Sequence, residues 1–138
     1  MTMKIRRVGY YNTIIEGHAE RSGEVLAAIA ASGVSLLGFE ATPQGAGRTK
    51  ITLCPDDASR MTGQATAAGL RFDGPFPALH IQSDDDEPGT CADIFHRLSQ
   101  AGVRVSESSG IAGVFDKYGV IVYLEEDQCD KAIAALES

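Results

Sequence analysis

The chain repeats itself, and this repeat constrains its fold more than any other feature of the sequence. When the sequence is shifted by 69 residues, half of its 138, Gly33 falls on Gly102 and the apolar positions of the two halves coincide. The aligned pairs include Val25 with Ile94, Ile29 with Leu98, Ile51 with Val120 and Leu53 with Val122. Apolar character and turn glycines agree without a gap through the third expected strand of each half. Such a repeat predicts two copies of one supersecondary unit.

The first half is expected to alternate strands and helices. Val25 and Ile29 stand at helical spacing, and Gly33 is placed to end their helix as a C-terminal cap. The glycines near residue 45 favour a hairpin turn. The expected ranges are strands at Val8–Glu16, Val34–Ala41, Thr49–Leu53 and Leu70–Asp73, helices at Arg21–Ser32 and Asp57–Ala68, and the turn at Thr42–Arg48.

The second half is expected to follow the same order but lacks a final strand. Its expected ranges are strands at Ala78–Ser83, Val103–Ile111 and Tyr118–Leu124, and helices at Pro88–Ala101 and Gln128–Leu136. The order βαββα(β), twice over, predicts two ferredoxin-like α+β units, each an antiparallel sheet with helices on one face. The shift lays Met1–Val8 over Leu70–Pro77, so we expect residues 3–7 to complete the second sheet. The predicted modules are 1–76 and 77–138.

Composition excludes several functional classes. The net charge of −7 disfavours a nucleic-acid partner, because an acidic chain repels phosphate backbones. No segment approaches the roughly 18 apolar residues of a membrane span, and the N-terminus does not resemble a signal peptide, so a cytoplasmic protein without a membrane partner is expected. The three cysteines are widely separated, without a CxxC motif, which predicts reduced thiols and no thiolate metal site.

The stretch DDDEPGTCADIFHRLSQAGVRV resembles ACT domains, which are regulatory modules that bind amino acids and related molecules. In it, acidic residues end a strand, Pro88-Gly89 opens an amphipathic helix, and Gly102-Val103 follows. The pattern SGIAG…DKYGVIVYL is also similar to the second unit of small tandem ACT proteins. The resemblance spans the chain. It implies a non-catalytic, amino-acid-sensing protein without a cofactor, which acts on a partner enzyme or regulator or by oligomerisation, as a homodimer.

The expected ligand site is the loop of the second module, formed by Asp86, Glu87, Pro88, Gly89 and Thr90. Amides at a helix start carry partial positive charge and suit a carboxylate. A glycine there lets the backbone approach the ligand, and an acidic side chain can pair with an ammonium group. The first module carries Glu20 where the second carries Gly89, so no binding is expected at the first loop. Glu40 or Glu107 of a facing module is a candidate for the opposite wall.

Two alternatives remain open at this stage. A tandem βαβββ metalloenzyme similar to glyoxalases would use His80 with Glu40 or Glu107 as metal ligands. That fold requires strands at Asp57–Ala68 and Gln128–Leu136, where the alanine-rich composition favours helices. A purely structural dimerisation module would show an occluded interface and no pocket. The acidic run 84–87 is better explained as a solvated helix start than as a metal site, so no metal is expected.

Overall fold

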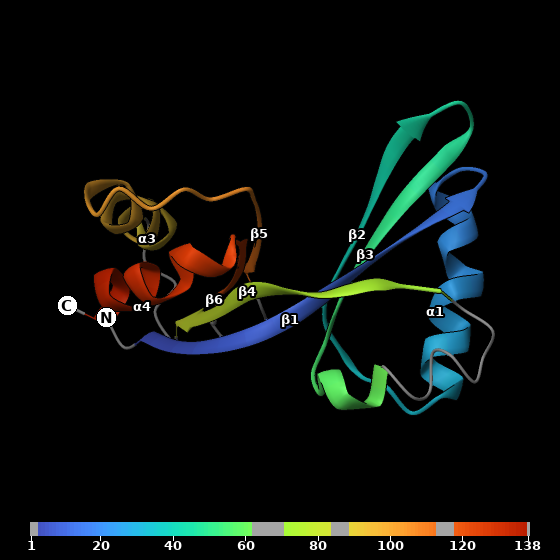
Figure 1. The fold of residues 1–138 in the computed structure, drawn as a ribbon, viewed down its shortest axis with the longest axis horizontal. Helices are drawn as coiled ribbons and strands as arrows, with labels where there is room; N and C mark the ends of the chain where they lie inside the picture. The colour runs from blue at the N-terminus through green and yellow to red at the C-terminus, as the bar shows by residue number, and fades with distance from the viewer. Residues whose placement is uncertain (1–2, 62–70, 84–88, 113–117, 138) are drawn as a thin grey trace. The chain divides into compact units, whose positions relative to one another are not determined.

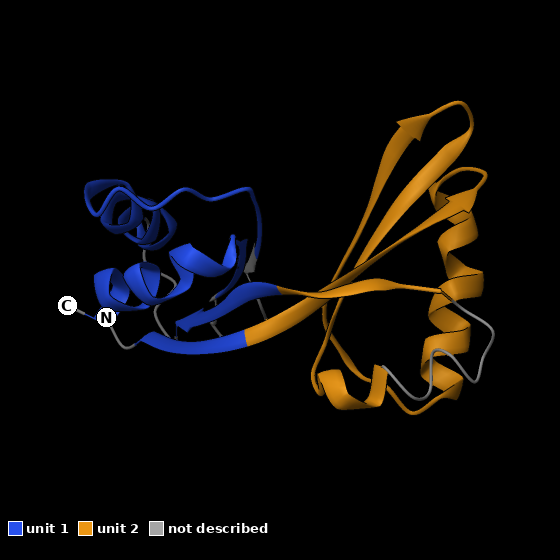
Figure 2. Cartoon of the chain, in the orientation of Figure 1, with its two compact units in different colours: residues 1–7, 77–138 blue, residues 8–76 orange. Residues whose placement is uncertain are grey.

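A computed structural model describes residues 3–61, 71–83, 89–112 and 118–137 of the chain. The chain divides into two compact units, shown in Figure 2: unit 2 is Val8–Phe76, and unit 1 joins Met1–Arg7 to Pro77–Ser138. Strands β1 (Met3–Glu16) and β4 (Asp73–Ser83) each contribute residues to both units. The first residues of the chain therefore belong to the same unit as its C-terminal half.

Unit 2 has the strand order β2-β3-β1-β4. Its elements are β1, α1 (Ser22–Ala31), β2 (Leu36–Gly45), β3 (Arg48–Pro55), a helical stretch at residues 58–61 and the start of β4 (Figure 1). A short 3-10 helix, Ala19–Arg21, precedes α1. Strand β3 pairs antiparallel with both β1 and β2.

Unit 1 has the equivalent order β5-β6-β4-β1. Its elements are the rest of β4, α3 (Thr90–Gln100), β5 (Glu107–Ala112), β6 (Tyr118–Tyr123), a 3-10 helix (Glu126–Gln128), α4 (Cys129–Glu137) and the N-terminal part of β1. Strand β6 pairs antiparallel with both β4 and β5. In each unit the chain runs through the elements of a ferredoxin-like fold, so the expected α+β fold class is confirmed.

Each unit has its own core between one face of its sheet and its helices. The core of unit 2 consists of Tyr11, Val25, Ile29, Val34, Ile51, Leu53 and Met61. The core of unit 1 consists of Leu79, Ile81, Ile94, Leu98, Val120, Val122, Leu124, Cys129, Ala132 and Leu136. Met3 and Ile5 of β1 pack against this second core. The strand residues in each core alternate along their strands, as one-sided burial of a sheet requires.

The two halves are equivalent in structure as well as in sequence. Gly38 pairs with Cys54 in unit 2 and Glu107 pairs with Tyr123 in unit 1, which is the same pair after a shift of 69 residues. The first helix of each unit ends in the same way.

In unit 2 the amide of Val34 donates to the carbonyl of Ile29 at 3.3 Å, and in unit 1 the amide of Val103 donates to that of Leu98 at 3.0 Å. Both are 6→1 bonds of a Schellman motif. The motif needs a left-handed residue just before its last position, which explains the glycines at 33 and 102, with φ of 79° and 72°.

Two expected boundaries were wrong. The hairpin turn is shorter than Thr42–Arg48, because β2 continues to Gly45 and only Ala46 and Gly47 connect the strands. Pro43 can pair opposite Thr49 within the ladder because β2 is an edge strand, where a missing N–H is tolerated.

The second error concerns β4, which runs unbroken from Asp73 to Ser83 through two prolines, where the sequence predicted separate strands at Leu70–Asp73 and Ala78–Ser83. Residues 71 and 72 precede the strand, and residues 62–70, including most of the expected helix Asp57–Ala68, lie outside the described residues. Within the described part of the chain, no helix is long and apolar enough to cross a membrane.

Candidate functional site

The expected ligand loop lies at the start of α3, and the structure describes its last two residues. Asp86, Glu87 and Pro88 fall outside the described residues, whereas Gly89 and Thr90 are described. Gly89 is the residue before the helix and has a φ of 97°, in the left-handed region. Its carbonyl accepts the amide of Asp93 at 2.8 Å, which closes the first turn of α3.

The space above Gly89 is open. A Cβ atom added to this residue would meet nothing within 4 Å. No side chain caps the amides at the start of α3, while Thr90 beside it is buried, with 5% of its surface exposed. Uncapped helix amides beside a bare backbone form a surface that favours an anionic group such as a carboxylate.

The equivalent loop of unit 2 is occupied by its own arginine. Arg21 stands where unit 1 has Thr90, and its Nη1 donates to the carbonyl of Glu16 at 3.3 Å, while its Nη2 lies 3.1 Å from Oε2 of Glu24. A Cβ atom added to Gly17 would lie 2.5 Å from Cδ of Arg21, so this side chain lies directly over the loop backbone. The two loops therefore differ more than the exchange of Gly89 for Glu20 suggested.

A pocket of about 290 Å³ adjoins this first loop, lined by Ile15, Glu16, Arg21, Glu24 and Val25. The loop backbone is held from its other side, because the Oγ1 of Thr49 donates to the carbonyl of Gly17 at 2.8 Å. The sequence reasoning singled out Glu20, which is exposed, and missed Arg21. The signal available in the sequence was the spacing of Arg21 and Glu24, since residues three apart on a helix are neighbours.

The structure contradicts the metalloenzyme alternative. The segment after the third strand of unit 1 is helix α4, where a βαβββ module requires a strand. His80 is buried in the middle of β4 opposite Ile121 of β6, whereas Glu107 aligns with Tyr123 and so with Ala78. Among the described residues, no three His, Cys, Asp or Glu side chains form a group that could hold a metal ion.

The cysteines of the chain are free thiols. Cys54 and Cys129 are buried, and Cys91 on α3 is partly exposed. Burial raises the pKa of the Cys129 thiol, because the low-dielectric core disfavours a thiolate. A thiol held neutral in this way is a weak nucleophile, which matches a structural role.

Comparison with known proteins shows which fold this is. No protein-family model and no curated protein matches the sequence. Among solved structures, protein BT0572 from Bacteroides thetaiotaomicron superposes with a TM-score of 0.77 at 16% identity, over 98% of this chain and 88% of that one. The regulatory subunit of aspartate kinase from Thermus flavus matches with a TM-score of 0.59 at 12% identity, over 99% of this chain and 95% of the subunit. The fold is ACT-like.

A complete enzyme provides a useful contrast in size. Aspartate kinase from Clostridium acetobutylicum matches with a TM-score of 0.59 at 17% identity, over 96% of this chain but only 33% of that protein. The ACT-like chain thus has the extent of a regulatory subunit and about one third of that of a whole kinase. At these identities the comparisons establish the shared fold.

Proposed function

We propose that this protein binds an amino acid or a closely related small molecule, and that it regulates a partner protein or its own assembly without catalysing a reaction. The observation that carries the proposal is the match to the aspartate kinase regulatory subunit over 99% of this chain. That protein is a regulatory subunit by description, and the present chain shares its fold over almost its full extent.

The proposed ligand site is the start of α3. The ligand carboxylate binds the uncapped amides beside Gly89, where the open space accepts it. Asp86 and Glu87 precede this point in the sequence and pair with the ligand ammonium, and Pro88 leads the chain into the turn. A group with both charges fits this arrangement better than a simple anion does.

The first loop is proposed not to bind the ligand. Arg21 already lies over its backbone and pairs with Glu24, and Glu20 stands in the position of Gly89. A carboxylate approaching the first loop would have to displace that ion pair and approach the Glu20 carboxylate. The proposal therefore assigns one ligand site to each chain, in unit 1.

A thermal-shift screen of the proteinogenic amino acids tests the function directly. A ligand that binds only the folded state adds about 2.7 kcal/mol at 100 times its Kd. For a chain of this size, that corresponds to a rise in Tm of several degrees. If no amino acid or related metabolite raises the Tm by more than about 1 °C at millimolar concentration, the proposal is wrong.

Two substitutions at one position then test the site. Any side chain at Gly89 strains the backbone, because its φ is 97°. Gly89→Ala carries that strain without a charge, and Gly89→Glu adds a carboxylate where the ligand carboxylate should lie. We expect calorimetry to show at least about ten-fold weaker binding for Gly89→Glu than for Gly89→Ala, which is about 1.4 kcal/mol. Glu20→Gly is the control in the first loop and should leave the affinity unchanged, whereas equal affinities of the two Gly89 variants would refute the site.

A further inference from the structure

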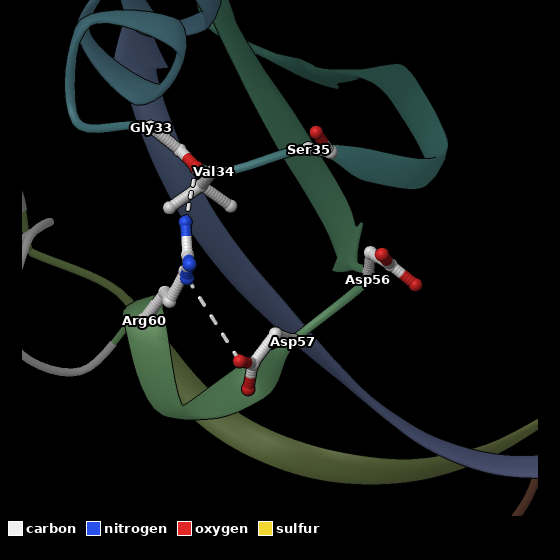
Figure 3. Close-up of a pocket in the computed structure, with 6 residues that line it drawn as sticks. All are labelled: Gly33, Val34, Ser35, Asp56, Asp57 and Arg60. Atoms are coloured by element: carbon white, nitrogen blue, oxygen red, sulfur yellow. Dashed lines mark hydrogen bonds and ion pairs between the residues drawn. The ribbon is translucent and has the colours of Figure 1, made fainter.

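A second pocket lies at the opposite end of α1 from the first loop. It encloses about 240 Å³ and is lined by Gly33, Val34, Ser35, Asp56, Asp57 and Arg60, as Figure 3 shows. These residues come from the turn after α1 and from the segment that follows β3. Because α1 has ten residues, about 15 Å of helix separates this pocket from the first loop.

One side of this pocket is already neutralised by an internal cation. Nη1 of Arg60 donates to the carbonyl of Gly33 at 3.2 Å, and its Nε lies 3.9 Å from Oδ2 of Asp57. Asp56 lies on the wall opposite Arg60 in Figure 3. The formal charge of the lining residues is −1, and the C-terminal end of α1 adds the partial negative charge of a helix terminus. The electrostatics of the pocket therefore favour a cation.

The repeat shows what the same place holds in the other half of the chain. A shift of 69 residues carries Ser35 to Arg104 and Asp56 to Glu125. In unit 1 the Nη2 of Arg104 lies 3.6 Å from Oε2 of Glu125 and 3.9 Å from Oδ2 of Asp127. A guanidinium group from the chain itself thus pairs with the carboxylate that corresponds to Asp56.

The cation beside the turn glycine also has a counterpart. In unit 1 the Nζ of Lys131 lies 3.4 Å from the carbonyl of Gly102, as Arg60 lies beside the carbonyl of Gly33 in unit 2. Unit 1 therefore has two internal cations at this place, the lysine and the arginine. Unit 2 has the first of them, and a serine replaces the second.

We propose that the pocket of unit 2 binds a small organic cation, whose guanidinium or primary ammonium group takes the place that Arg104 fills in unit 1. Asp56 is the main anionic contact, and the hydroxyl of Ser35 lies beside the same space. The small side chain of Ser35 leaves the space open, whereas an arginine at this position fills it. This site is separate from the one proposed at α3 and does not depend on the identity of the ligand there.

Agmatine is a suitable probe because it carries both a guanidinium and a primary ammonium group. We would titrate it into the ¹⁵N-labelled full-length protein at low salt, where exposed ion pairs are least screened. The expected result is a set of saturable amide shifts at residues 33–35 and 56–57. Shifts that do not saturate, or that spread evenly over the acidic surface of the molecule, would overturn the proposal.

Two variants with matched controls decide which residues hold the probe. Asp56→Asn should weaken agmatine binding by about five-fold, which corresponds to the upper value of about 1 kcal/mol for an exposed ion pair. Its control, Glu125→Gln, removes the equivalent carboxylate from unit 1 and should not change the affinity. If Asp56→Asn binds agmatine as tightly as Glu125→Gln does, the assignment is wrong.

Ser35→Arg gives unit 2 the arrangement of unit 1. Ser35 is exposed, so the longer side chain has room, and its guanidinium should occupy the pocket, abolish the saturable shifts and leave the Tm unchanged or slightly higher. Ser99→Arg adds the same charge at an exposed position on α3 and should leave agmatine binding intact. Undiminished binding by a folded Ser35→Arg variant would refute the proposal.

Discussion

Replacing Ile5 with alanine should destabilise unit 1, although Ile5 is separated in the sequence from nearly all of that unit. Its side chain packs with Met3 against the apolar core between the sheet and helices α3 and α4. Truncating a fully buried isoleucine costs about 2–5 kcal/mol, and Ile5 is only partly buried, so we expect a loss of about 1–2 kcal/mol. At about 3–5 °C per kcal/mol for a chain of this size, the Tm should fall by roughly 3–10 °C.

Urea unfolding followed by circular dichroism measures this loss, and the neighbouring residue provides the control. Lys4 is exposed on the same strand, and successive side chains of a strand point to opposite faces, so Lys4→Ala should change the stability by less than about 0.5 kcal/mol.

Deleting residues 1–7 removes both apolar side chains and the ion pairs of Arg7 with Glu126 and Asp130. Those pairs are exposed and add at most about 1 kcal/mol, so the deletion should cost about 3 kcal/mol or more, chiefly through lost packing. Equal midpoints for Ile5→Ala and Lys4→Ala, or an unchanged Tm after the deletion, would show that this strand does not stabilise unit 1.

Three further predictions address the glycines, the buried thiol and the assembly. Gly33→Ala should destabilise the protein by about 1 kcal/mol because φ is 79°, while Gly23→Ala within α1 should stabilise it by about 0.5–1 kcal/mol; urea midpoints that shift in the same direction would contradict this. Because burial raises the pKa of Cys129, its contribution to stability is complete below the ordinary thiol pKa of about 8.5 and is lost as the pH rises above it. The stability of Cys129→Ala should therefore fall less between pH 8 and pH 10 than that of the parent protein, and parallel pH profiles would count against this. Light scattering at micromolar concentration should show a homodimer, since β2 and β5 are edge strands of their units, and a monomer would refute this expectation.

The sequence by itself determined the repeated α+β architecture and most of its helices and strands. Apolar residues at helical spacing placed α1 and α3, and Gly33 and Gly102 marked their ends because a Schellman motif needs a left-handed residue there. These signals are local: each depends on residues a few positions apart, so they can be read without knowledge of the rest of the fold.

Other features required the tertiary structure. The continuity of β4 through Pro75 and Pro77 could not be predicted, because a proline argues against a strand unless its neighbours in the sheet are known. The position of Arg21 over Gly17 depends on the angle at which α1 leaves β1, which the residue pattern does not specify.

The pocket beside Asp56 is the clearest case of this kind. It forms where two turns meet that are more than 20 residues apart in the sequence, one after α1 and one after β3. The sequence contains both Ser35 and Arg104, but their difference gains a meaning only when the fold places each beside a carboxylate. Side chains distant in sequence become neighbours only through packing of the whole unit, so such sites are decided by the tertiary structure and not by any local pattern.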